Sequence, residues 1–231
     1  MKIFTIATDD YLPGVQALRN SLRQFFEPDL TLLTLGQCDL SKIEKIDRIP
    51  LEAFGVFECP TDNEWMLRAF QKLLLFNLPF HEKILYLDAD QICMKDPTPL
   101  FKYPALSMPE MVGVERQYYK GQIMADTGLM VLEPDDDLFV ELHHYFYMYT
   151  GDLHSADMNI INAFFYDRHP FEFCLLPYHF SMTKRVLTHF PELWNPGKAM
   201  FLHFLGPKPW TEEGRNEKEY HEVVKIWEQF R

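Results

Sequence analysis

The chain has 231 residues, with 22 Lys and Arg against 34 Asp and Glu, which gives a formal net charge of −12. A chain of this length buries about three quarters of its unfolded surface in one core, so a single large domain is expected. The acidity argues against a nucleic-acid partner, because neutralising phosphates needs a basic face. It also argues against binding to an anionic membrane surface, and no apolar run reaches the roughly 18 residues of a membrane span.

The cysteines are dispersed along the chain and form no C-x-x-C pair, which predicts free thiols and not disulfides. The first ten residues carry only a short apolar run before two acids, too short for a secretory signal. We therefore expect a cytoplasmic protein with no membrane insertion. The four cysteines are Cys38, Cys59, Cys93 and Cys174.

The first ninety residues alternate between strand-like and helix-like segments. Apolar residues that recur at three- and four-residue spacing predict the helices, and Pro13 suits a first helical turn. This alternation indicates an α/β domain with a largely parallel sheet. The expected elements are a strand at 2–8, a helix at 13–26, a strand at 30–35, a helix at 40–47, a strand at 54–58, a helix at 65–77 and a strand at 84–87.

Beyond residue 90 the order of elements changes, and the second half is expected to be mixed. No repeat or clear linker divides it from the first half. The expected elements are strands at 111–114 and 128–132, helices at 138–149 and 157–165, strands at 173–176 and 200–205, and a helix at 217–230.

An Asp-Ala-Asp sequence at 88–90 directly follows the apolar strand at 84–87. Alternate residues at the end of a strand point to the same side, so Asp88 and Asp90 are expected to face one point. That point lies where ligands of open α/β sheets gather, beyond the carboxyl ends of the strands. Two convergent carboxylates repel each other unless a cation or a shared proton intervenes, and hard divalent ions favour such oxygen ligands.

Chance alone supplies about one Asp-x-Asp in a chain of this composition. A second occurrence at 135–137 is expected to be a solvated loop and the start of a helix. The prediction of a metal site at Asp88 and Asp90 therefore depends on the apolar strand that precedes them, and not on the Asp-x-Asp spacing alone.

A second segment, from His203 to Trp210, begins where a late apolar run ends. Gly206 allows a close backbone approach, and Lys208 lies between two prolines that fix the backbone. Alone, the segment also fits a loop with a buried aromatic anchor. Together with Asp88 and Asp90 it offers an imidazole ligand and an ammonium group that can bind a diphosphate.

Five segments of the chain resemble the signatures of the family 8 retaining glycosyltransferases, the glycogenin-like group, and they occur in the same order along the sequence. Lys72, sixteen residues before Asp88, matches a lysine of that pattern. The resemblance implies a single GT-A domain of the α/β class over 1–231. It would comprise a Rossmann-like nucleotide-binding half at about 1–90 with a mixed central sheet, a smaller mixed acceptor half at about 91–210, and a C-terminal helix at 217–231. The matching blocks are 6–11, 86–90, 126–134, 156–165 and 203–210.

The resemblance implies a metal-dependent transferase that moves a hexose, with glucose as the first expectation, from a UDP-sugar to an acceptor with retention. The acceptor could be a glycan, a small molecule or a protein. Asp88, Asp90 and His203 would bind Mn²⁺, which such a mixed oxygen and nitrogen shell suits better than the alternative, Mg²⁺. Asp157, Asp126 and Lys72 would be catalytic. The donor-binding residues would be Thr8, Asp9, Tyr11, Lys72, Ala89, Asp126, Thr127, Gly206 and Lys208.

Two positions depart from the family pattern and keep alternatives open. Asp126 stands where the family often has Asn, and Met158 stands where it often has Gln, which argues against a covalent intermediate there. A catalytically impaired UDP-sugar-binding protein of the same fold is therefore one alternative. A haloacid-dehalogenase-like phosphatase also places Asp-x-Asp after an apolar strand, but it leaves the segment 203–210 unexplained. The sequence predicts no oligomeric state.

Overall fold

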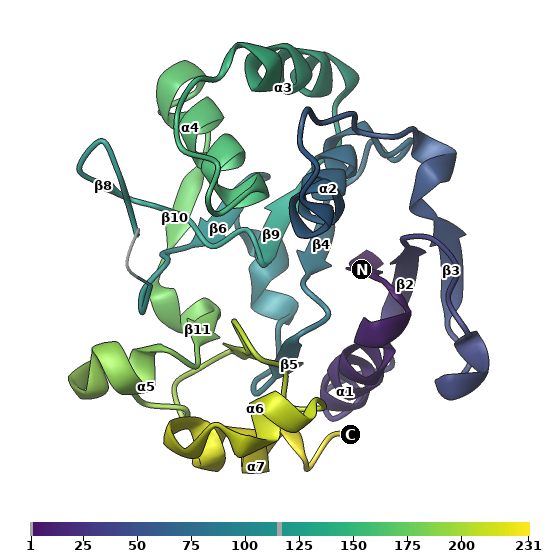
Figure 1. The fold of residues 1–231 in the computed structure, drawn as a ribbon, viewed down its shortest axis with the longest axis vertical. Coiled ribbons are helices and arrows are strands. Elements are labelled where there is room, and N and C mark those ends of the chain that lie inside the picture. Colours follow the sequence, from purple (N-terminus) through teal and green to yellow (C-terminus); the bar gives the residue numbers. More distant parts are fainter. Residues whose placement is uncertain (1, 115–116) are drawn as a thin grey trace.

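A seven-stranded mixed sheet crosses the middle of the molecule (Figure 1). The structure is a computed structural model that describes residues 2–114 and 117–231. Residues 1, 115 and 116, which the predicted domain at 1–231 includes, lie outside the described residues. The strand order is β10-β6-β9-β4-β1-β2-β3. The strands are β1 (Lys2–Ala7), β2 (Asp29–Thr34), β3 (Asp47–Pro50), β4 (Ile84–Leu87), β6 (Ser107–Pro109), β9 (Leu129–Leu132) and β10 (Cys174–Leu176).

Strand direction reverses at β9. Strand β1 pairs in parallel with β2 and β4, and β2 pairs in parallel with β3. Strand β9 instead runs antiparallel to both β4 and β6. The predicted α/β class with a mixed central sheet is therefore confirmed. Because β9 is antiparallel, it begins at the edge of the sheet where β1 and β4 end.

Helices cover the sheet and bury both of its faces. The two faces of β4 alternate as expected for a strand: Tyr86 packs into the cluster formed with α3 and α4, whereas Leu85 and Leu87 pack into the cluster formed with α1. Burial on both faces explains why this strand is apolar throughout. The helices are α1 (Leu12–Leu22), α2 (Glu64–Phe70), α3 (Asp136–Met148), α4 (Asp157–Arg168), α5 (Val186–His189), α6 (Glu212–Asn216) and α7 (His221–Trp227).

Two smaller sheets extend the second half of the chain. The first has the order β11-β12-β5 and consists of β5 (Gln91–Cys93), β11 (Met182–Thr183) and β12 (Phe201–His203). In it, β12 runs antiparallel to β5, with His203 opposite Gln91. The second is the hairpin of β7 (Tyr118–Tyr119) and β8 (Gln122–Ile123). The first pairing matters for the site, because it brings His203 beside the residues that precede β5.

Several predicted elements differ from the structure. The predicted helix at 40–47 is wrong: a short 3-10 turn occupies Leu40–Lys42, and β3 follows at the edge of the sheet. The predicted strand at 54–58 is also wrong. Gly55 adopts φ +115°, and the side chain of Gln71 bonds both the amide and the carbonyl of Phe57, so no ladder forms.

The remaining differences in the described residues are one absent strand and two helices that are shorter than predicted. The predicted strand at 111–114 is absent from the described residues, and β6 lies just before it. The predicted helix at 65–77 divides into α2 and a 3-10 segment, Gln71–Asn77, and the helix at 217–230 reduces to a 3-10 turn and α7. All four cysteines are free thiols, as predicted. Within the part of the chain that the structure describes, no helix has both the length and the apolar character that crossing a bilayer requires.

Candidate functional site

A cleft of about 1190 Å³ opens at the edge of the sheet where β1 and β4 end and β9 begins. The amide of Asp88 donates to the carbonyl of Gly128 over 2.8 Å, which joins the end of β4 to the start of β9. All of the predicted site residues except Asp9 line this cleft. They are Thr8, Tyr11, Lys72, Asp88, Ala89, Asp90, Asp126, Thr127, Asp157, His203, Gly206 and Lys208.

Asp88 and Asp90 converge through a turn and not through strand alternation. Strand β4 ends at Leu87, and the amide of Gln91 donates to the carbonyl of Asp88 over 3.2 Å. Ala89, at the tip of the turn, is buried against the start of α1. This close packing requires a glycine at position 14 of α1, because a Cβ there would lie 2.3 Å from the carbonyl oxygen of Ala89.

His203 completes a cluster with these two carboxylates. One ligand atom from each of Asp88, Asp90 and His203 lies within 4.8 Å of the others. The Nε2 atom of His203 is 3.2 Å from Oδ1 of Asp90 and 3.7 Å from Oδ2 of Asp88. The amide of Phe204 also donates to the carbonyl of Asp90 over 2.9 Å, so the β12–β5 pairing fixes this neighbourhood.

The other ring nitrogen of His203 is held by Asp126. Nδ1 lies 3.0 Å from Oδ2 of Asp126, whose carboxylate also accepts from the Ser181 hydroxyl at 2.6 Å and from the Gly128 amide at 2.9 Å. Nε2 is buried and has no hydrogen-bond partner among the described residues. A histidine ligand of a metal commonly donates its second ring nitrogen to a carboxylate in this way. A buried Nε2 that makes no hydrogen bond and lies beside two carboxylates therefore fits a divalent cation.

Burial and neighbouring charges compete at this cluster. Burial lowers the pKa of His203, but the carboxylates of Asp126 and Asp90 outweigh it and raise the pKa to about 10. Burial raises the pKa of Asp90, but the ammonium of Lys208 and the imidazolium of His203 outweigh it and hold the pKa well below its usual range. Metal binding requires a neutral imidazole, so a cation would displace the proton of His203.

Lys72 and Asp157 form the wall of the cleft beside Asp88. The ammonium of Lys72 lies 3.0 Å from Oδ1 of Asp88 and 3.0 Å from Oδ2 of Asp157. The Thr127 hydroxyl donates to Asp157 at 2.8 Å, and the Tyr86 hydroxyl donates to Asp88 at 2.6 Å. Burial lowers the pKa of Lys72, but Asp157 and Asp88 outweigh it, so the pKa is raised and the ammonium stays charged.

Lys208 forms the opposite wall. Its ammonium pairs with the carboxylate of Asp90, donates to the carbonyl of Phe204 over 3.1 Å and lies 5.5 Å from the ring centre of Tyr11. Gly206 adopts φ +76°, a backbone conformation that favours glycine. The segment thus presents an exposed backbone and a cation next to the acidic cluster.

The turn after β1 divides its residues between the cleft and the surface. Asp10 lines the cleft, although the sequence did not single it out, whereas Asp9 accepts from the Asp39 amide at 2.7 Å and pairs with Lys42. The turn is a 3-10 segment, Asp9–Tyr11, in which successive side chains point in different directions. A contact between Asp9 and a donor remains a prediction.

Trp210, the aromatic residue that ends the segment from His203, ties the two loops at the mouth of the cleft together. It packs edge-to-face on Tyr11 with ring centres 5.6 Å apart and donates from Nε1 to the carbonyl of Asp10 at 2.9 Å.

Other residues that line the cleft were missed from the sequence. Arg68 lines the cleft one helical turn before Lys72, and that i,i+4 spacing could have indicated it. No motif marks Arg185, the residue just before α5, or His189, the last residue of α5, although both line the cleft.

Comparison with known proteins identifies the family of this chain. The model of the family described as Glycosyl transferase family 8 matches residues 2–214. The chain belongs to glycosyltransferase family 8. This membership sets aside the phosphatase alternative and confirms the resemblance drawn from the motifs.

Curated relatives of this family 8 chain are larger than it is. A putative UDP-glucuronate:xylan alpha-glucuronosyltransferase 5 from Arabidopsis thaliana is 26% identical over 88% of this chain and 35% of its own length. Glycogenin from Neurospora crassa is 28% identical over 96% of this chain and 33% of its own length. The chain therefore spans about a third of the length of these relatives.

A solved structure has the same fold over nearly its whole length. The galactosyltransferase LgtC, in complex with donor and acceptor sugar analogs, superposes with a TM-score of 0.71 at 17% identity, covering 100% of this chain and 96% of LgtC. At this identity the likeness establishes the fold alone. It confirms the predicted GT-A architecture.

Proposed function

We propose that the protein binds a UDP-sugar together with a divalent metal ion and transfers the hexose to an acceptor hydroxyl with retention of configuration. The observation that carries this proposal is the buried Nε2 of His203, which makes no hydrogen bond in the described residues and lies between the carboxylates of Asp88 and Asp90. The names of the relatives support the donor class, since they include glucuronosyltransferases that use UDP-glucuronate.

The charges packed around His203 and Lys72 also favour a cation. Four carboxylates of this inner part of the cleft face two ammonium groups, so a neutral His203 leaves an excess of two negative charges among these largely buried groups. Uncompensated buried charge is costly, and a divalent ion offsets it. Oxygen and nitrogen ligands together suit Mn²⁺, with Mg²⁺ as the alternative. The carboxylates are Asp88, Asp90, Asp126 and Asp157, and the ammonium groups belong to Lys72 and Lys208.

The two loops at the mouth of the cleft would hold the nucleotide. Thr8 and Tyr11 would contact the uridine, with the ring of Tyr11 as a stacking surface. The ammonium of Lys208 would turn from Asp90 to the diphosphate, and the backbone of Gly206 would approach the phosphates closely. When bound, the metal ion would neutralise the diphosphate and stabilise the charge that develops on the leaving group.

The transfer step needs few groups from the protein. The bond between the anomeric carbon and the diphosphate oxygen breaks, and a bond to the acceptor oxygen forms on the same face. The acceptor proton passes to a phosphate oxygen. Asp157, fixed by Lys72 and Thr127, would stabilise positive charge on the sugar ring or position the acceptor. Asp126 would orient the imidazole of His203, because its carboxylate lies against Nδ1 of that ring.

A donor panel tests the proposal. Purified protein with Mn²⁺ is incubated with UDP-glucose, UDP-galactose or UDP-glucuronate, and released UDP is measured with and without candidate acceptors. We expect UDP release from UDP-glucose, and a loss of about 100-fold or more for Asp90→Asn. Asp62→Asn, an exposed change outside the cleft, serves as the control. Tight UDP binding without release from any donor would instead identify the impaired binding protein that Asp126 and Met158 suggested.

A further inference from the structure

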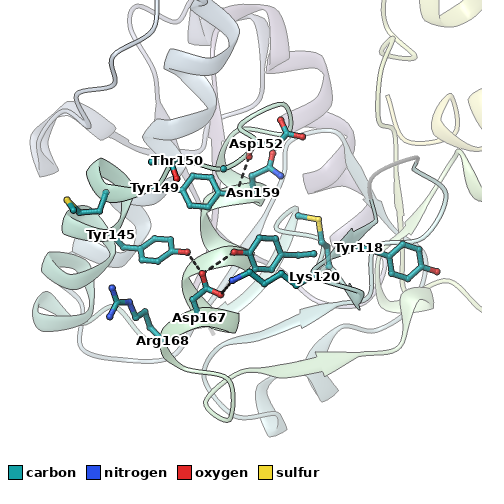
Figure 2. A pocket seen from close by; sticks show the side chains of 13 residues that line it. Tyr118, Lys120, Tyr145, Tyr149, Thr150, Asp152, Asn159, Asp167 and Arg168 are labelled. Carbon is teal, nitrogen blue, oxygen red and sulfur yellow. Dashed lines mark hydrogen bonds and ion pairs between the residues drawn. The ribbon is translucent and has the colours of Figure 1, made fainter.

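A second hollow lies between the β7–β8 hairpin and the helices α3 and α4 (Figure 2). Its volume is about 730 Å³, within the range of roughly 300–1,000 Å³ that is typical of small-molecule pockets. Four tyrosines line it: Tyr118 and Tyr119 from the hairpin, and Tyr145 and Tyr149 from α3 and its end. We refer to it as the tyrosine pocket.

Asp167 holds the walls of the tyrosine pocket in place. Its Oδ2 accepts from the hydroxyl of Tyr145 at 2.7 Å and from that of Tyr119 at 3.0 Å, and its Oδ1 accepts from the ammonium of Lys120 at 2.7 Å. Figure 2 shows Tyr145 and Lys120 directed toward this carboxylate. One carboxylate thus joins the hairpin to α3 and α4. The rings of Tyr119 and Tyr145 are therefore held in place.

Hydrogen-bond donors without partners point to an oxygen-rich ligand. Asn159 lines the pocket although it is only 6% exposed, and its Oδ1 accepts from the Ser155 amide. Its amide nitrogen and the hydroxyl of the exposed Thr150 make no hydrogen bond among the described residues, and neither atom is fully buried, so both are open to a ligand. The guanidinium of Arg168 lies 5.8 Å from the ring centre of Tyr145 and pairs with no carboxylate in the described residues.

We propose that the tyrosine pocket binds the pyranose rings of an oligosaccharide. A pyranose presents faces of C–H groups, which pack on tyrosine rings, and edges of hydroxyl oxygens, which accept from donors such as Asn159 and Arg168. Tyrosine supplies such contact area at low conformational-entropy cost. The identity of the ligand rests on the proposed function, because a sugar-transferring enzyme meets saccharide chains as acceptors or products.

The tyrosine pocket and the donor cleft share two thin walls. Met124 lines the pocket and Asp126 lines the cleft, two residues apart on one extended segment, which is roughly 7 Å. Asn159 and Asp157 bear the same relation on the first turn of α4, a rise of about 3 Å. The tyrosine pocket therefore lies next to the donor cleft, on the other side of these two segments.

Binding of defined saccharides tests this proposal without turnover. Maltohexaose, cellohexaose and xylohexaose are titrated into the protein by calorimetry and saturation-transfer NMR, at up to about 10 mM because weak affinity is expected. We expect at least one to bind. Tyr118→Ala and Thr150→Val change exposed residues that the fold does not need, and each should weaken binding by about fivefold. Phe171→Ala, an exposed aromatic residue outside the pocket, should leave it unchanged.

UDP binding with Mn²⁺, measured in the same samples, separates the two proposals. If UDP binds and no hexasaccharide does, or if both pocket variants bind as well as the unchanged protein, the tyrosine pocket is not a saccharide site. If a hexasaccharide binds in a Tyr118-dependent way and UDP does not bind, the saccharide site stands and the proposed function fails.

Discussion

Nδ1 of His203 lies 3.0 Å from Oδ2 of Asp126, a residue 77 positions earlier in the chain. This contact orients the imidazole so that Nε2 faces Asp88 and Asp90. Neither Asp126 nor His203 can move without disturbing the other, because both are about 2% exposed. Metal affinity should therefore depend on a residue that is not itself a ligand.

Asp126→Asn tests that dependence. The amide oxygen can still accept from Nδ1, but the charge that strengthens the contact is lost, so we expect Mn²⁺ to bind about 10-fold more weakly. Free Mn²⁺ measured by electron paramagnetic resonance gives the affinity directly. Asp62→Asn, an exposed change of the same chemistry, should have no effect. Equal affinities for Asp126→Asn and the unchanged protein would show that Asp126 does not support the site.

Lys72→Met leaves two acidic groups of the cleft, Asp88 and Asp157, without their shared ammonium. Removing one partner of a buried ion pair costs about 3 kcal/mol or more, so the free energy of unfolding in urea should fall by that order. Lys225→Met breaks an exposed pair with Glu222 and should cost less than about 0.5 kcal/mol. Similar losses for both lysines would contradict the buried pairing.

Gly14→Ala tests the packing of α1 on the Asp88–Asp90 turn. The new Cβ would lie 2.3 Å from the carbonyl oxygen of Ala89 and 2.6 Å from the ring of Trp210. We expect a loss of about 1–3 kcal/mol despite the better helix propensity of alanine, together with weaker UDP binding. At Gly197 a Cβ would meet only Asn195, at 3.4 Å, so Gly197→Ala should be nearly neutral. Unchanged thermal unfolding of Gly14→Ala would contradict the close approach.

Asp167→Asn should make stability less dependent on pH. Burial raises the pKa of Asp167, but hydrogen bonds from Lys120, Tyr145 and Tyr119 outweigh it and hold the pKa below its ordinary value. A carboxyl with a lowered folded-state pKa stabilises the protein above its unfolded pKa, and that stability is lost as the pH falls through the folded pKa. Asp167→Asn should therefore be less stable than the unchanged protein near pH 7, with a gap that closes below about pH 4. Urea unfolding across this range measures it, and a constant gap would contradict the shifted pKa.

The strand that leads into the site was predictable because its signal is local. Residues 84–87 are apolar on both faces, and Asp88 follows directly, so the sequence placed the carboxylates at the end of a buried strand. It assigned their convergence to strand alternation, however, whereas a turn produces it. A turn of three ordinary residues lacks the Gly or Pro that would have marked it.

Long-range pairings explain what local patterns missed. His203 reaches the acidic turn through the β12–β5 pairing. The periodicity of the sequence gives no sign of this pairing, so the prediction that His203 joins Asp88 and Asp90 came from the family resemblance. The failed strand at 54–58 has a similar cause, since the side chain of Gln71 takes the backbone bonds of Phe57. Arg185, just before α5, lines the cleft without any signal in its neighbours along the chain.

The most direct test of metal-dependent sugar transfer follows UDP release from UDP-glucose by the unchanged protein with Mn²⁺, then after excess EDTA, and then after Mn²⁺ is restored. We expect release to stop in EDTA and to return with Mn²⁺. His203→Ala should show little release under any condition, whereas His144→Ala, an exposed histidine on α3, should behave like the unchanged protein. Release that continues at the same rate in EDTA would contradict the metal-dependent function.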